Sequence, residues 1–183
     1  MLKTHYFFAL SLPSETKRYL DECMHLMEAQ NSFKKWVHPE DYHLTLAFLG
    51  SAEKLGPVLE KAGSLQLPAF PLTLERFGTF GKSDSPRILW MGILSSDMLH
   101  NVRGRVYGAC EETGFQLDKR PFSPHITVGR KWNEQTPFTD EWLNGFQPAA
   151  SHTFTATEMV LYQTHPDRTP KYEAIYTIPF QAN

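Results

Sequence analysis

Two pairs of histidine and threonine are the residues of this sequence best suited to carry chemistry. The first pair stands in "HLTLAFLG", where His43 is followed two positions later by Thr45, and the second in "HITVGR", with His125 and Thr127. Residues two apart on a β-strand project from the same face of the sheet. Each segment therefore presents an imidazole and a hydroxyl on one face and apolar side chains on the other.

Two imidazoles that face each other can act as an acid and a base, because histidine titrates near neutral pH. Two threonine hydroxyls and an arginine can hold a phosphate by donating hydrogen bonds to its non-bridging oxygens. This set of groups suits the cleavage of a phosphodiester without a metal. The sequence contains no HExxH motif and no paired cysteines that indicate a zinc site, so we expect neither a metal nor another cofactor.

The elements around the two motifs also occur twice. His43 and His125 are 82 positions apart, and the same offset places the strand expected at 5–12 on the one expected at 87–94 without a gap. A helix is expected after each of these strands, beginning near Ser14 and near Ser96. Two copies of a unit indicate two similar lobes, because a solenoid needs at least three. Lobes packed about a pseudo-twofold axis bring the two histidines into one cleft.

The remaining segments predict further strands and helices within one domain that covers 1–183. Alternating apolar residues and turn signals predict strands, whereas apolar residues at helical spacing predict helices. The expected elements are a helix within 51–63, a strand at 69–80, a short helix or loop at 136–146, and two final strands at 152–164 and 170–180.

Composition limits the possible partners. The formal net charge is −2 and the isoelectric point is near 6.4, which argues against a protein that coats nucleic acid through bulk electrostatics. Any contact with nucleic acid is expected to be local, such as one strand end. Cys23 and Cys110 are too few for a disulfide framework, and no apolar run is long enough to span a membrane, so we expect a cytoplasmic protein without a membrane partner.

The motifs and their flanks resemble the 2H phosphoesterase superfamily, which is named for two HxTx motifs. Within it the sequence is most similar to the RNA 2′,3′-cyclic phosphodiesterases, also described as LigT-like 2′-5′ RNA ligases. The resemblance extends over nearly the whole chain and rests on "FFALSLP", "HLTLAFLG", "RILWMGI", "RPFSPHITVGR" and "YTIPF". It implies an α+β fold of two lobes related by a pseudo-twofold axis, with antiparallel sheets that line a central cleft and helices packed outside.

The resemblance also implies roles for five residues. His43 and His125 correspond to the catalytic pair, and Thr45, Thr127 and Arg130 to groups that bind the phosphate. The implied reaction opens a terminal 2′,3′-cyclic phosphate to a 2′-phosphate. We expect His125 to be the base and His43 the acid, although the symmetry of the motifs leaves the opposite assignment open. Strict alternation from His125 turns Arg130 to the wrong face, so a bulge, a twist or the strand end must redirect it.

Other functions remain compatible with these residues. The alternatives within the family are 2′-5′ RNA ligation and hydrolysis of another cyclic nucleotide or of a diester at the 3′ end of RNA. A protein that only binds RNA ends or nucleotides is the alternative outside enzymes, but binding alone does not need an acid and base pair. The expected partners are RNA cyclic phosphate ends or cyclic nucleotides as substrates. No obligate protein partner is expected, and the chain is predicted to be a monomer.

Overall fold

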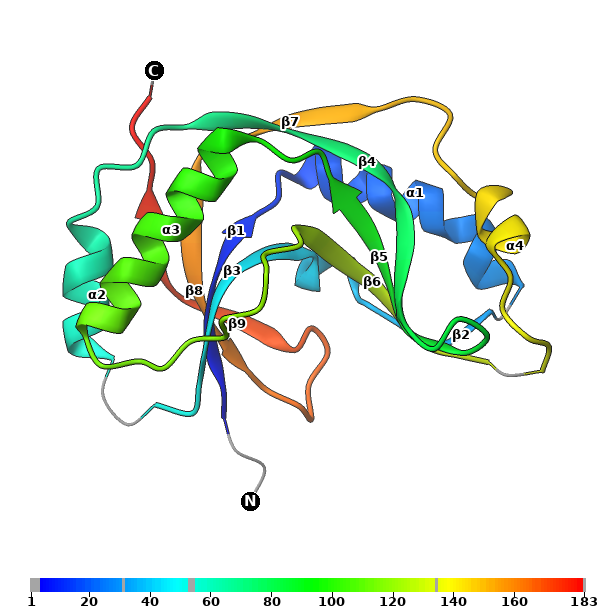
Figure 1. Cartoon of the computed structure of the whole chain (residues 1–183), viewed down its shortest axis with the longest axis horizontal. Coiled ribbons are helices and arrows are strands. Elements are labelled where there is room, and N and C mark those ends of the chain that lie inside the picture. The colour runs from blue at the N-terminus through cyan, green and yellow to red at the C-terminus, as the bar shows by residue number, and fades with distance from the viewer. Residues whose placement is uncertain (1–3, 31, 53–54, 134, 183) are drawn as a thin grey trace.

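Two antiparallel sheets form the body of the molecule in the computed structural model, which describes residues 4–30, 32–52, 55–133 and 135–182 (Figure 1). Every pair of neighbouring strands in these sheets is antiparallel. The four-stranded sheet has the order β3 (His43–Gly50), β1 (Tyr6–Ser11), β8 (Glu158–Thr164) and β9 (Tyr172–Pro179). The five-stranded sheet has the order β2 (Phe33–Trp36), β6 (His125–Trp132), β5 (Pro86–Ile93), β4 (Phe70–Gly81) and β7 (His152–Ala156).

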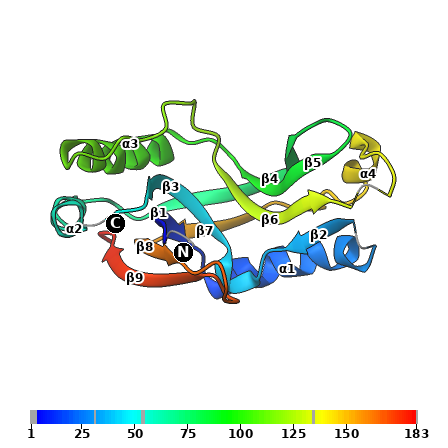
Figure 2. The same cartoon turned by 90° about the horizontal axis from the view of Figure 1, so that it is seen from below.

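The helices lie outside the sheets, and the two long ones cover the sheet that they do not directly follow. α1 (Ser14–Ala29) follows β1 of the four-stranded sheet but contacts β7 of the five-stranded sheet. α3 (Asp97–Glu112) follows β5 of the five-stranded sheet but contacts β3 of the other. Figure 2 shows these two helices on opposite sides of the molecule. Each long helix therefore packs on the sheet of the other half of the chain, which links the two halves. The two-lobed α+β architecture expected from the sequence is confirmed.

Shorter helices complete the shell. α2 (Gly56–Gly63) packs against α3, α4 (Asp140–Asn144) forms a single turn beside the five-stranded sheet, and a 3-10 helix at Pro39–Asp41 precedes β3. The long helices bury equivalent apolar positions, since Leu20 and Val102 are both fully buried and are 82 positions apart. No helix in the described part of the chain is long and apolar enough to cross a membrane.

The internal repeat is present, but the gapless alignment expected from the sequence is off by one residue for one strand. The residue paired with Thr45 is Ala9, and the residue paired with Thr127 is Trp90, so the partner strands are offset by 81 positions and not by 82. Both pairings also contain a register shift at the same place, opposite Leu46 in one and Val128 in the other. The two motif strands are therefore equivalent and share a register shift at the same position.

The tail differs from the expected single strand at 152–164. The chain breaks at Thr157, so that β7 completes the five-stranded sheet while β8 joins the four-stranded one. Apolar residues are buried on both sides of the break, including Phe154 in β7 and Leu161 in β8. A continuous apolar pattern therefore concealed a crossing from one sheet to the other.

Candidate active site

The two motif strands contact each other at the junction of the sheets, which brings the two halves of the candidate site together. The positive charge of a protonated His125 contributes to lowering the pKa of His43, and the charge of Arg130 lowers the pKa of both rings. Coulombic effects of this kind require that the charges lie close to one another. The two histidines and the arginine singled out in the sequence therefore lie near one another where β3 and β6 meet.

The two imidazoles are held by the same hydrogen bond. Nδ1 of His43 lies 2.7 Å from the carbonyl oxygen of Asp41, and Nδ1 of His125 lies 2.7 Å from that of Ser123. A carbonyl oxygen only accepts, so in both rings Nδ1 carries the proton and donates. Nε2 of each neutral ring then keeps its lone pair for a proton of the reactants.

Aromatic side chains enclose both rings and reduce their contact with water. The ring of His43 packs against Phe7, Tyr172 and Tyr162, with centroid distances of 4.8, 5.0 and 5.9 Å. Burial lowers the pKa of His43 to about 4, against the opposing effect of its hydrogen bond to the Asp41 carbonyl. A ring in this environment is neutral at pH 7 unless a negative charge is brought beside it.

His125 has a more open surrounding. Phe80 meets its ring edge-on at 4.9 Å and is 37% exposed, and the indole of Trp90 lies at 6.3 Å. Burial also lowers the pKa of His125, opposed by the hydrogen bond to Ser123 and assisted by the charge of Arg130. Burial therefore favours the neutral form of both rings in the free protein.

Arg130 reaches the site through a register shift in its own strand. β6 loses strict pairing with β5 between Leu89 and Trp90, and beyond this point Arg130 pairs with Lys35 on one side and Ile88 on the other. The irregularity that the sequence required is thus present. Arg130 lines a cavity of about 580 Å³ together with Asp41 and Tyr172.

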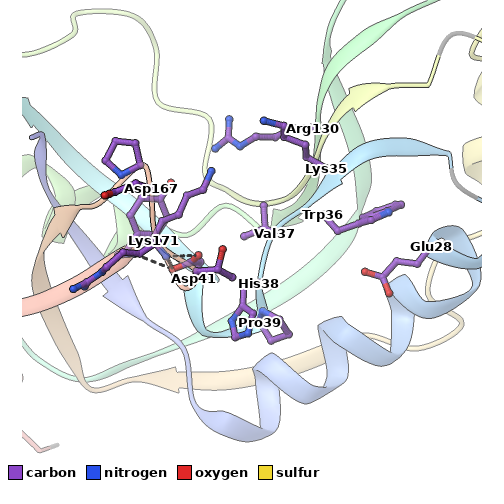
Figure 3. A pocket seen from close by; sticks show the side chains of 14 residues that line it. Glu28, Lys35, Trp36, Val37, His38, Pro39, Asp41, Arg130, Asp167 and Lys171 are labelled. Atoms are coloured by element: carbon purple, nitrogen blue, oxygen red, sulfur yellow. Dashed lines mark hydrogen bonds between the residues drawn. The ribbon is translucent and has the colours of Figure 1, made fainter. Parts of the chain in front are cut away.

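This cavity adjoins His43 more closely than His125. Asp41 and Tyr172, which line it, both contact His43, whereas Ser123, Phe80 and Trp90, the neighbours of His125, do not line it. Figure 3 shows Arg130 and Lys35 on one side of the cavity, opposite Asp41 and Lys171. The charged side chains that line it are the cations Lys35, Arg130, Arg168 and Lys171 and the anions Glu28, Asp41 and Asp167.

Asp41 is the site residue that sequence reasoning missed. Its carboxylate is only 4% exposed and accepts hydrogen bonds of 2.9 to 3.0 Å from the backbone N–H groups of Lys171 and Tyr172. Its carbonyl accepts a hydrogen bond from His43, so a single residue connects the His43 ring to the beginning of β9. The signal in the sequence was its position, since Asp41 and Ser123 each stand two residues before a motif histidine.

The motif threonines lie on the strands as expected. Thr45 and Thr127 are both half-buried, and neither hydroxyl bonds to another side chain or backbone group among the described residues. Both hydroxyls are therefore available to a ligand. The same part of the chain contains no cluster of three or more His, Cys, Asp or Glu side chains that could hold a metal ion.

A family model described as the 2′-5′ RNA ligase superfamily matches residues 15–168 of the chain. The chain belongs to this superfamily. A relative from Geobacillus stearothermophilus named RNA 2′,3′-cyclic phosphodiesterase is 43% identical over 183 residues, which are 98% of this chain but only 58% of the relative's length. A relative of the same name from Bacillus subtilis is 31% identical and is matched over 96% of both chains.

Solved structures of the superfamily agree with the fold. The crystal structure of Escherichia coli LigT complexed with 3′-AMP is similar with a TM-score of 0.80 and 27% identity, over 97% of this chain and 98% of that one. A Thermus thermophilus structure named TT0787 has a TM-score of 0.81 at 20% identity, which supports the fold alone. The resemblance to the 2H phosphoesterases expected from the two motifs is confirmed.

Proposed function

We propose that the protein hydrolyses the 2′,3′-cyclic phosphate at the end of an RNA to a 2′-phosphate, with His43 and His125 as the acid and base and without a metal. The observation that carries the proposal is the matched pair of imidazoles, each fixed at Nδ1 by a carbonyl two residues earlier. A protein that only bound nucleotides has no need of two rings oriented in this way. The names of the relatives and the bound 3′-AMP of LigT agree with this substrate class.

The reaction needs one proton to leave water and another to reach the departing oxygen. The base takes a proton from water as its oxygen forms a bond to phosphorus, and the acid gives a proton to the 3′ oxygen as the bond between that oxygen and phosphorus breaks. An in-line displacement places the two groups on opposite sides of phosphorus. The two histidines, which come from equivalent strands of two pseudo-symmetric halves, suit these opposite positions.

The position of the cavity favours His43 as the acid and His125 as the base. The leaving oxygen belongs to the ribose, and the cavity that can hold a nucleoside lies beside His43. In the free protein the pKa of His43 is about 4, so the donor form of this ring depends on the substrate. The negative charge of the bound phosphate raises the pKa of a neighbouring imidazole, so binding of the substrate favours the protonated form of His43.

Thr45, Thr127 and Arg130 are proposed to stabilise the charge on the non-bridging oxygens. Neither threonine hydroxyl bonds to another group among the described residues, and Arg130 lines the cavity beside His43, which supports this assignment. Fixed donors aimed at oxygens that gain charge in the transition state are among the strongest contributions to catalysis. The guanidinium of Arg130 also reaches the cavity and so can contact the phosphate and the ribose end together.

The test is hydrolysis of a 2′,3′-cyclic nucleotide in excess EDTA, with chromatographic identification of the product isomer. A 2′-phosphate formed at the same rate with and without EDTA is expected, and His43→Ala and His125→Ala should each lower kcat by roughly 10²- to 10⁴-fold. A substrate with sulfur in place of the bridging 3′ oxygen needs little protonation of its leaving group. It should restore much of the rate of His43→Ala but not of His125→Ala.

Three results contradict the proposal in different parts. Rescue of His125→Ala instead of His43→Ala reverses the two roles, and a 3′-phosphate product reverses the leaving group. Tight nucleotide binding by the wild-type protein without turnover under any condition favours a protein that senses RNA ends.

A further inference from the structure

A second cavity, of about 400 Å³, lies at the end of the five-stranded sheet near the β4–β5 hairpin. Four of the residues that line it are cations, namely Lys34, Lys82, Arg87 and Lys131, and no carboxylate among the described residues lines it. We call this cavity the cationic groove. The chain as a whole carries a net charge of −2, so the groove concentrates positive charge in one place. Such a local excess attracts a polyanion.

The four cations form a row across neighbouring strands. Lys34 lies on β2, Lys131 on β6 and Arg87 on β5, and Lys82 directly follows β4. These strands are adjacent in the order β2-β6-β5-β4. Because neighbouring strands lie about 4.8 Å apart, the row extends over roughly 15 Å. A row of this length fits several phosphates of an extended strand better than it fits one small anion.

The backbone at Lys131 is irregular and leaves two consecutive cations of β6 outside the core. Lys131 has a φ of 61°, a left-handed conformation that is uncommon for a residue other than glycine, asparagine or aspartate. With this irregularity, Arg130 and Lys131 both remain outside the core, while Trp132 returns to it. On the paired strand β2, Lys34 and Lys35 are likewise both exposed. Adjacent residues thus line the two cavities, because Lys35 and Arg130 line the one beside His43 and Lys34 and Lys131 line the cationic groove.

The distance from the reaction centre suits a short strand. Lys131 is six residues beyond His125 on β6, which corresponds to about 20 Å at roughly 3.3 Å per residue. We propose that the cationic groove binds the phosphate backbone of a single-stranded RNA whose cyclic-phosphate end lies between the two histidines. This inference rests on the proposed function and extends it, because it makes an RNA end, and not a free cyclic nucleotide, the preferred substrate. The affinity of the groove for RNA should fall as the salt concentration rises, because phosphate contacts release counterions.

The experiment compares two substrates and two double variants. The substrates are a 2′,3′-cyclic mononucleotide and oligoribonucleotides of two to six nucleotides that end in a 2′,3′-cyclic phosphate. Lys82→Gln/Arg87→Gln removes two cations of the groove, and Arg18→Gln/Arg105→Gln removes two exposed cations on the outer helices α1 and α3 as a charge-matched control. kcat/KM is measured for each combination of protein and substrate at 0.1 M and at 1 M salt.

For the wild type, kcat/KM should rise with oligomer length and level off at about four nucleotides, the lower end of the range for single-strand sites. Each phosphate contact on single-stranded nucleic acid changes affinity by about fivefold per tenfold change in salt. Loss of two contacts should therefore lower kcat/KM for the longer oligomers by about 25-fold at 0.1 M salt and by much less at 1 M. Hydrolysis of the mononucleotide by the groove variant, and of both substrates by the control, should stay at the wild-type level.

Two results overturn the inference. The first is that the groove variant and the control have equal kcat/KM on the longer oligomers. The second is that the groove variant loses the same factor in kcat/KM on the oligomers and on the mononucleotide. Failure of the proposed function is separate and appears as absence of turnover of both the mononucleotide and the oligoribonucleotides by the wild type. In that case fluorescence anisotropy of a labelled oligoribonucleotide with a 3′-terminal phosphate still compares binding by the two variants. Equal competition by a polyglutamate peptide of the same charge contradicts an RNA ligand and indicates an acidic protein segment.

Discussion

Replacing Asp41 by asparagine tests whether this residue holds the His43 ring in place. The substitution keeps the size of the side chain but removes its charge and leaves one oxygen to serve two backbone N–H groups, those of Lys171 and Tyr172. A hydrogen bond to a charged group contributes about 1.5 to 3 kcal/mol, and a buried donor left without a partner is costly. We expect Asp41→Asn to lower the free energy of unfolding by about 2 kcal/mol, because the carboxylate is almost fully buried.

The catalytic effect of the same substitution follows from the link to His43. The Asp41 carbonyl binds Nδ1 of His43, and Tyr172, held by the Asp41 carboxylate, packs edge-on against the His43 ring. A displacement of about 1 Å in a catalytic group can cost as much as 10²-fold in rate. We therefore expect kcat to fall by roughly 10- to 100-fold, with a smaller change in KM.

Urea unfolding followed by circular dichroism measures the first effect, and hydrolysis of a cyclic nucleotide measures the second. Asp167→Asn is the matched control, because Asp167 lines the same cavity but is exposed. It should leave both the stability and kcat within error of the wild type. Asp41 does not hold the His43 ring if Asp41→Asn keeps its kcat and its free energy of unfolding stays within about 0.5 kcal/mol of the control, a difference usual for surface substitutions.

Three further results are expected. Thr45→Val or Thr127→Val should each lower kcat by about 10²-fold, as loss of one fixed donor to a charged oxygen does, with an unchanged melting temperature. The pKa of His43 is about 4 in the folded protein and 6.5 in the unfolded chain, so the unfolded state binds more protons between these pH values. The free energy of unfolding measured in urea should therefore fall by at most about 2 kcal/mol from pH 7 to pH 5. His43→Gln should lack that part of the loss. Gly78→Ala should lower the free energy of unfolding by about 1 to 3 kcal/mol, because the added Cβ would overlap the indole of Trp90. A variant as stable as the wild type contradicts that packing.

The sequence predicted the elements whose patterns repeat. Both motif strands, the helices after β1 and β5 and the meeting of the two histidines follow from residue spacing, because alternation and helical periodicity are local properties. The strand β2 escaped, since "FKKW" is short and carries two lysines, as edge strands often do. The break at Thr157 escaped because a continuous alternation does not record which sheet its residues join.

The roles of Arg130 and Asp41 depend on features that a single sequence does not record. The position of Arg130 needed a register shift, and the sequence could state that need but not locate the shift. Asp41 precedes His43 by two residues, yet its carboxylate binds a segment 130 positions away. A buried acid that bonds only to backbone N–H groups has no partner side chain to indicate it in the sequence.

The difference between the two halves of the site lies in the side chains and not in the backbone. Asp41 and Ser123 are 82 positions apart and present the same carbonyl to the two imidazoles, so both rings begin with the same proton on Nδ1. Only Asp41 adds a buried carboxylate that draws the beginning of β9 over its histidine, and with it Tyr172. That enclosure favours the neutral form of the His43 ring in the free protein. Two equivalent strands of a repeat thus place the same side chain in different surroundings, because a neighbouring strand closes over one ring and the other ring stays more open.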